Sequence, residues 1–293
     1  MVLSVAITAA ATAGQLHTAA PQTMTTGCVL TPGFQRTVTG IVDPDTVTLD
    51  DGSELRLAGT IGPRALDAAA SIDNWPPETE AIAALAALVL GRTVDIHPMT
   101  PRTDRYRRLV AHVFVARDGR RMWVQGDLIA EGHARAYGMG DTAHCAGGLI
   151  ALERDARAAK RGLWAHAAYF ERASYRTREL MRLRSTFQIV SGRVRKVAEM
   201  KSATYLNFGT DWRSDFTAGL KLGKGELTLP EFNAMVRALE GRRVRVRGWI
   251  DRRNGPYIEI AHPSELEVLD EGPPGQTEQP ATVAGANEKR PER

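Results

Sequence analysis

Hydrophobic and polar residues alternate in short runs near the start of the chain, which is the period of β-strands. Three such runs, residues 36–42, 46–50 and 53–59, are separated by the turn sequences DPD and DDG, which are typical of hairpins. Apolar residues then recur at helical spacing from residue 81, behind Pro77, which suits a first helical turn. We therefore expect three strands and a helix.

Two further apolar runs, residues 93–98 and 109–115, predict strands, and residues 124–131 and 149–160 predict helices. The last helix should end at Gly162, because Lys160 and Arg161 precede that glycine as a helix C-terminus favours. Three strands, a helix and two strands are the order of a five-stranded OB barrel.

The same order returns in the second half of the chain. Strands are predicted at residues 187–200, 203–212 and 215–222, a helix at 229–241, and strands at 242–251 and 257–269. The predicted fold class is α+β, mostly β. It comprises an OB-type barrel with three helices and a second, smaller OB-like barrel.

The expected domain limits follow from this order. Residues 28–166 form the first domain, residues 167–186 a basic linker helix, and residues 187–269 the second domain. Residues 270–293 are rich in Pro, Gly, Gln, Thr and charged residues without periodicity, so we expect a disordered tail.

Composition changes this picture little, because a net charge of +4 over 293 residues only mildly favours a polyanionic partner. No later apolar run reaches the about 18 residues of a membrane span.

Residues 1–20 have the apolar region and small residues of a signal peptide, although they lack an early Lys or Arg. We expect export to the periplasm or medium, with a disordered leader as the alternative.

Cysteine usage agrees with export. The chain has two cysteines, Cys28 and Cys145, and a disulfide between them would tie down the mature N-terminus in an oxidising compartment. Two buried thiols are the alternative.

Five segments occur in order across residues 35–164: VDPDTVTL, ELRLAGTIGPR, RTDRYRRLVAHVFV, WVQGDLIAEGHARAY and ALERDARAAKRGLW. This ordered set resembles the thermonuclease family, also called staphylococcal-nuclease-like. The resemblance implies phosphodiester hydrolysis with Ca²⁺, which two Asp side chains hold. It also implies a Glu general base and two arginines on the phosphate, where negative charge develops.

Transferred to this chain, the resemblance makes Asp45 a metal ligand and Arg56 and Arg108 the two catalytic arginines. Arg105 and Tyr106 take positions from which the family approaches a nucleotide. Tyr137 matches an aromatic near the nucleotide. Each also has a plain structural interpretation: Asp45 as a turn residue, Arg56 as a partner of a hairpin carboxylate, and Tyr137 as a packing residue.

Two expected acids are missing from this chain. Ile61 stands where the second metal Asp belongs, and Arg64 stands where the base belongs. Isoleucine cannot ligate Ca²⁺, and arginine neither accepts a proton at neutral pH nor tolerates a nearby cation. A divalent cation is therefore doubtful, unless another acid approaches: Asp43, Asp67, Asp73, Glu78 or Glu80.

The second half offers aromatic residues among arginines. Its strand RRVRVRG alternates strictly, so one face should be all arginine, which favours a polyanion. The alternative is that these arginines are the solvated face of an amphipathic strand.

These observations give three hypotheses. The first is an exported nuclease-like protein that binds DNA or RNA and cleaves phosphodiesters with an altered active site. The second is an inactive module that binds nucleic acid or another anionic polymer, with Arg64 adding to the binding surface. The third is an envelope scaffold that binds protein.

Overall fold

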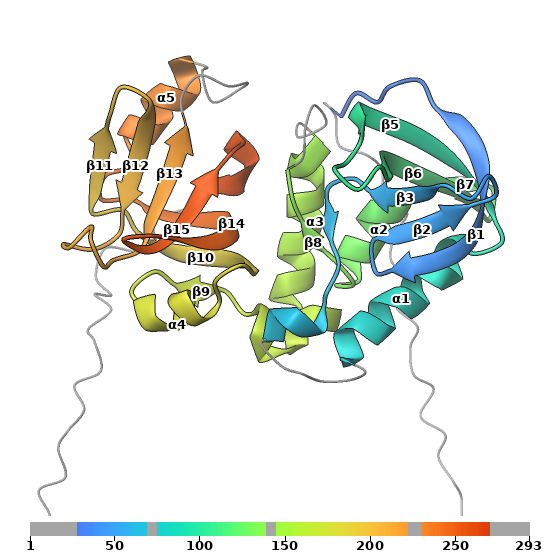
Figure 1. Cartoon of the computed structure of the whole chain (residues 1–293), viewed down its shortest axis with the longest axis horizontal. Coiled ribbons are helices and arrows are strands. Elements are labelled where there is room, and N and C mark those ends of the chain that lie inside the picture. The colour runs from blue at the N-terminus through green and yellow to red at the C-terminus, as the bar shows by residue number, and fades with distance from the viewer. Residues whose placement is uncertain (1–27, 69–74, 139–144, 222–229, 270–293) are drawn as a thin grey trace, which may run out of the picture. The chain divides into compact units, whose positions relative to one another are not determined.

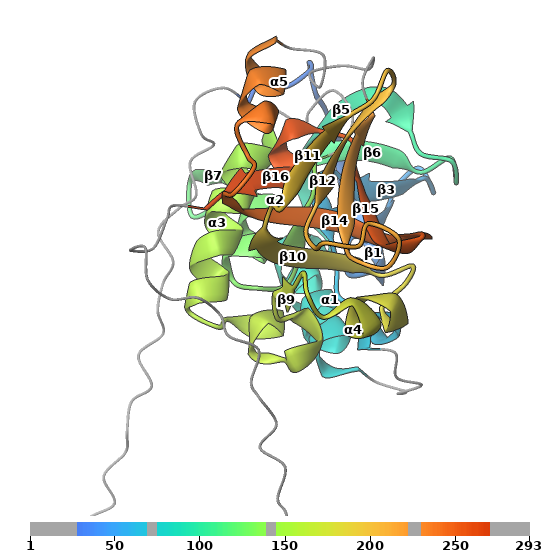
Figure 2. The same ribbon diagram turned by 90° about the vertical axis from the view of Figure 1, so that its left-hand side faces the viewer.

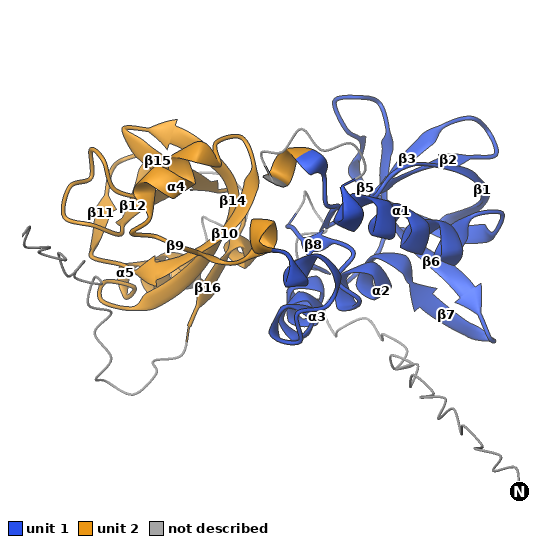
Figure 3. Cartoon of the chain, turned by 90° about the horizontal axis from the view of Figure 1, so that it is seen from below, with its two compact units in different colours: residues 1–65, 72–166 blue, residues 66–71, 167–293 orange. Residues whose placement is uncertain are grey.

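A computed structural model describes residues 28–68, 75–138, 145–221 and 230–269 (Figure 1). The chain divides into two compact units: residues 1–65 with 72–166, and residues 66–71 with 167–293 (Figure 3). The expected signal peptide, the expected tail and Asp73 lie outside the described residues. Among the described helices, none is both long and apolar enough to cross a membrane.

The first unit is built on a closed barrel of five strands. These are β1 (Phe34–Asp43), β2 (Thr46–Leu49), β3 (Glu54–Leu57), β5 (Thr93–Thr103) and β6 (Leu109–Arg117). They follow the order β3-β2-β1-β5-β6, and pairing of β3 with β6 closes the barrel. The predicted OB-type barrel is confirmed.

Three helices pack around this barrel, as predicted: α1 (Pro76–Val89), α2 (Val124–Ala130) and α3 (Ala146–Ala158). Leu85, Val89 and Leu149 of these helices are buried in one core with the strand residues Val38, Leu55 and Val113, and each such buried side chain contributes about 1.5–3 kcal/mol. Sequence periodicity missed the short elements β4 (Thr60–Ile61), β7 (Arg120–Trp123), β8 (Arg135–Ala136) and η1 (Ala65–Ala68).

A disulfide joins Cys28 and Cys145. The structure therefore agrees with the predicted disulfide and not with the alternative of two buried thiols. Cys145 is fully buried and directly precedes α3. The bond therefore fixes the start of the described chain to a helix of the first unit.

The second unit contains a curled sheet (Figure 2). Its order is β11-β12-β13-β15-β14-β10-β9. The strands β10 and β11 both come from the single predicted strand 187–200, which Val194 and Arg195 interrupt, and β11 ends this path while β10 lies next to its other end, β9 (Arg172–Ala173). The bounds are β10 (Phe187–Arg193), β11 (Lys196–Glu199), β12 (Ala203–Asn207), β13 (Thr217–Lys221), α5 (Pro230–Arg237), β14 (Arg243–Arg253) and β15 (Gly255–Ile260). The predicted order of three strands, a helix and two strands is observed with its first and last strands each divided in two, since residues 257–269 contain most of β15 and, after a break, β16 (Leu266–Val268).

The segment predicted as a linker helix, residues 167–186, is α-helical only in α4 (Thr177–Arg182). Ahead of α4, β9 (Arg172–Ala173) pairs with β10 in parallel. Ladder hydrogen bonds to an existing sheet thus take up backbone groups that a longer helix would have satisfied internally.

The arginine face predicted for β14 is not a solvated stripe. Arg247 is fully buried and Arg245 half-buried, and both pair with Glu267 of β16 (Leu266–Val268). Arg245 also pairs with Glu171, at 2.6 Å. Carboxylates from elsewhere in the chain neutralise these arginines, because burying a guanidinium without a partner is costly.

Candidate functional site

The turn between β1 and β2 places two carboxylates side by side. Asp43 accepts a hydrogen bond from the backbone N–H of Asp45 at 2.9 Å. The carbonyl of Asp45 accepts from Leu57 N at 2.8 Å. Asp45 is almost fully buried, so both its backbone and its carboxylate are held in place.

The segment after β4 approaches this turn through Gly62. Its N–H donates to Oδ2 of Asp45 at 2.9 Å. A Cβ on Gly62 would lie 2.4 Å from Cβ of Pro44, which is far inside van der Waals contact. A residue without a side chain is therefore required for this approach.

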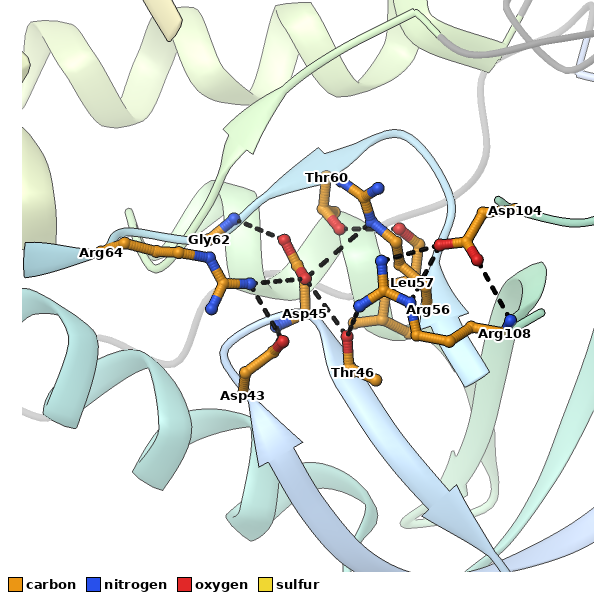
Figure 4. A network of polar contacts seen from close by, with 10 residues as sticks. All are labelled: Asp43, Asp45, Thr46, Arg56, Leu57, Thr60, Gly62, Arg64, Asp104 and Arg108. Carbon is orange, nitrogen blue, oxygen red and sulfur yellow. Dashed lines mark hydrogen bonds and ion pairs between the residues drawn. The ribbon is translucent and has the colours of Figure 1, made fainter. Parts of the chain in front are cut away.

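Arg64 projects between the two carboxylates (Figure 4). Its Nη2 lies 3.1 Å from Oδ2 of Asp43 and 3.2 Å from Oδ1 of Asp45. Glu78 of α1 accepts from Ala65 N at 3.0 Å and so anchors the residue after Arg64. One guanidinium thus bridges both acids of the turn.

The charges of this group shift its pKa values. Burial, with the nearby charge of Asp43, raises the pKa of Asp45 despite the opposing effect of Arg56 and Arg64. For Asp43, burial is outweighed by Arg64 and by hydrogen bonds, which together lower its pKa. Despite burial, the charges of Asp45, Asp43 and Glu78 raise the pKa of Arg64. Arg64 therefore stays cationic and keeps Asp43 ionised.

Arg56 lies on β3 opposite Thr46 of β2. Its Nε is 4.0 Å from Oδ1 of Asp45. The Nε atom of Arg56 is buried and has no hydrogen-bond partner among the described residues. Because buried donors are nearly always satisfied, this N–H is available to an acceptor that enters the site.

Arg108 reaches the same place from the start of the β6 region (Figure 4). Its Nε and Nη2 donate to Oδ2 of Asp104 at 2.9 and 2.7 Å, and Nη1 donates to Thr46 Oγ1 at 3.3 Å. Asp104 also accepts from the backbone N–H of Tyr106 and of Arg108. Despite the opposing effect of burial, these donors lower the pKa of Asp104, and the carboxylate orients Arg108.

Tyr106 is an exposed aromatic ring beside these arginines, with 62% of its surface accessible. The guanidinium carbons of Arg105 and Arg108 lie 4.9 and 5.2 Å from its ring centroid, which is cation–π range. Tyr137 is half-buried, and its N–H donates to Gly59 O at 2.9 Å. It follows β8, which pairs with β4, and so belongs to the β3–β4 edge of the site.

The residues present do not fit Ca²⁺. Calcium takes roughly six to eight oxygen ligands, whereas Arg64 occupies the space between the two carboxylates. Ile61 is buried and apolar. Of the other acids considered, Glu78 is engaged by Ala65 N, and Glu80 is exposed. No group of three or more His, Cys, Asp or Glu side chains suited to a metal occurs in the described part of the chain.

Several residues of this cluster were not predicted for these contacts. Thr46 and Asp104 hold Arg108, and Gly62 fixes Asp45. The spacing of Asp104 and Arg108, four residues apart, was a readable signal. The contacts of Thr46 and Gly62 depend on how the barrel closes, which no local pattern displays.

Comparison with protein families finds that residues 55–166 match the model described as staphylococcal nuclease homologue. Together with the closed barrel, this match shows that the first unit is similar to a staphylococcal-nuclease-type domain. A search of curated proteins gives no match for the chain.

Proposed function

We propose that the first barrel binds the phosphodiester backbone of DNA or RNA without needing a divalent cation. The observation that carries this proposal is the guanidinium of Arg64 between Asp43 and Asp45. It supplies positive charge at the point where two acids would otherwise gather a cation.

The arginines suit a phosphate ligand. Guanidinium groups donate in a planar fork that matches phosphate oxygens, and such charge-assisted hydrogen bonds are about twice as strong as neutral ones. Arg56 brings an unused, buried N–H, and Arg108 is held in one orientation by Asp104. Because Arg64 offsets part of the negative charge of Asp43 and Asp45, these acids repel a phosphate less than bare carboxylates do.

The exposed ring of Tyr106 favours a single-stranded ligand. Unpaired bases stack on exposed aromatic rings, with about 1–3 kcal/mol per base, and Arg105 adds a cation on the same edge. Tyr137 supplies a second aromatic at the β3–β4 edge. Any anionic polymer would meet the arginines, but only one with flat bases would use the ring of Tyr106.

Hydrolysis is the second candidate, because the domain is nuclease-like. It lacks support in the geometry. The carboxylates nearest Arg56 are bound to Arg64, and losing a general base typically lowers a rate by ~10²–10⁴. We therefore place binding ahead of cleavage.

The disulfide supports an oxidising, exported location, periplasmic or secreted.

The test is fluorescence anisotropy of the full chain with labelled single-stranded DNA and RNA, in Ca²⁺ and in chelator. We expect equal affinity in both conditions. Arg56→Ala and Arg108→Ala should each weaken binding roughly 10- to 100-fold, the range of a charged hydrogen bond. The matched control is Arg120→Ala, an exposed arginine at the start of β7 in the same unit, which should have no effect.

Cleavage is scored in the same samples. Chelator-sensitive cleavage that is lost in Arg56→Ala would contradict the proposal and favour an active nuclease. No binding even at low salt would instead favour the protein-binding scaffold. Ile61→Asp combined with Arg64→Glu restores both expected acids, and a gain of Ca²⁺-dependent cleavage in that variant would show that these two positions together account for the missing metal site.

A further inference from the structure

The second unit has a pocket of its own, with a volume of about 420 Å³. Three separate segments line it: helix α4, the loop between β12 and β13, and the hairpin between β14 and β15. This volume lies within the range of small-ligand sites. The segments bring four arginines together: Arg178, Arg182, Arg213 and Arg252.

The charge of this pocket is not neutralised from within. No carboxylate lines it, and none of the four arginines has an ion pair among the described residues. Glu179 of α4 is already bound by Arg172 and Arg176 on the chain before the helix, at 3.0 and 3.4 Å.

The other nearby acids are occupied by local hydrogen bonds. Asp211 accepts from Arg213 N and from Ser214 Oγ, and Asp251 accepts from Arg252 N. Asp211 carries an opposing charge near Arg213: the hydrogen bonds from Ser214 and from Arg213 N, with the charge of Arg213, lower its pKa. Convergence of like charges is unfavourable unless an anion joins them.

An aromatic ring stands beside the pocket. Trp212 is 52% exposed, and the guanidinium carbon of Arg213 lies 4.8 Å from its ring centroid. An exposed tryptophan next to a cationic pocket is the combination that holds a nucleotide, with phosphate on the arginines and the base on the ring. A simple inorganic anion would use the arginines alone.

We propose that this pocket is a second contact for single-stranded nucleic acid, in which the arginines hold a backbone phosphate and Trp212 stacks a base. The ligand class is that of the proposed function, but the site depends only on residues of the second unit. The two proposals can therefore fail separately.

The test compares the full chain with two double variants in binding to a fluorescent oligothymidylate over a range of salt. Arg182→Ala with Arg252→Ala removes two pocket cations. Arg195→Ala with Lys201→Ala removes two exposed cations of the same unit outside the pocket, with the same charge change. Both pairs are exposed, so circular dichroism should show unchanged folding.

The pocket variant should lose affinity, and its slope of log K against log salt should fall by about 0.7 for each phosphate contact removed. The control variant should keep both the affinity and the salt slope of the unchanged protein. Trp212→Ala should weaken binding by about tenfold without changing the slope, because a base stack carries no counterion. The same differences should persist in an Arg56→Ala, Arg108→Ala background, which separates this pocket from the first barrel.

Equal losses of affinity in the pocket and control variants would overturn the proposal, because the loss would then follow from the change in net charge alone. A pocket variant that binds oligothymidylate normally but loses binding to anionic phospholipid vesicles would also overturn it and assign the pocket to a membrane surface. Effects of Arg182 and Arg252 that vanish in the Arg56→Ala, Arg108→Ala background would place all nucleic-acid binding in the first barrel.

Discussion

Arg64 holds together two carboxylates that would repel each other in its absence. The lowered pKa of Asp43 and its short contact to Arg64 mean that the folded protein gains stability from the ionised Asp43 at neutral pH, whereas the raised pKa of the buried Asp45 acts in the opposite direction. The contribution is present above the ordinary pKa of an Asp side chain and is lost as the pH falls through the lowered pKa of Asp43.

Arg64→Ala should therefore destabilise the first unit at neutral pH by about 1–3 kcal/mol, a value limited by the partial exposure of the arginine. The two bare acids should then attract a cation, so Ca²⁺ should raise the melting temperature of the variant but not that of the wild type. Thermal unfolding with and without Ca²⁺ checks both statements. A variant whose melting temperature ignores Ca²⁺ would show that the two acids alone do not make a cation site.

Glu265 predicts a pH dependence in the second unit. It is buried, and burial raises its pKa from 4.5 to about 7, although Ala261 N and His262 N donate to it. The folded chain then keeps a proton that the unfolded chain has lost. The free energy of unfolding should accordingly decrease as the pH rises from about 4.5 to about 7 and level off above, by roughly 3 kcal/mol in all.

Glu265→Gln provides the control for this prediction. Its amide oxygen can still accept from Ala261 N, and it does not titrate, so the slope should disappear. Hydrogen exchange of β14 amides across this pH range measures the effect. A slope retained in the Gln variant would assign the titration to another group.

At the scale of elements, strands and helices were largely readable from the sequence, because each has one buried face and a clear period. The two-residue strands β4 and β8 could not be predicted, because they form only where another segment supplies the partner. The ion pairs of Arg245 and Arg247 on the arginine face of β14 could not be predicted for the same reason: their shared carboxylate, Glu267, comes from a strand that pairs with β14 only in the fold.

The site was partly readable too. The resemblance to the thermonuclease family placed Asp45, Arg56, Arg64 and Arg108 near one another, and the structure brings them into one cluster (Figure 4). The bridge from Arg64 to Asp43 was not foreseen, because 21 residues separate them in the sequence and only closure of the barrel makes them neighbours. The roles of these residues remain predictions.

The disulfide gives a prediction for the first unit. It joins residues 117 positions apart, and closing a loop of that length removes about 4–5 kcal/mol of chain entropy from the unfolded state. Reduction should lower the melting temperature of the first unit, as differential scanning calorimetry would detect. Cys28→Ser with Cys145→Ser should match the reduced protein and ignore reductant, and a wild type equally indifferent to reductant would argue against the bond.

At the scale of the molecule, each unit has a hydrophobic core made from its own residues. One core includes Leu55, Leu85 and Leu149, and the other includes Leu206, Phe216 and Val246. Separate cores favour separate unfolding. We expect two calorimetric transitions, of which reductant shifts one and the titration of Glu265 the other. A single transition that responds to both treatments would instead indicate one cooperative unit.

The guanidinium between Asp43 and Asp45 has a further consequence if the first barrel binds as proposed. A metal ion has a dissociation constant, so a protein that needs one is regulated by its surroundings and stops working where the ion is scarce. A positive charge built into the chain is present at fixed stoichiometry from the moment of folding. Such a protein would hold its ligand equally in dilute, chelating or calcium-rich media and would give up any response to them.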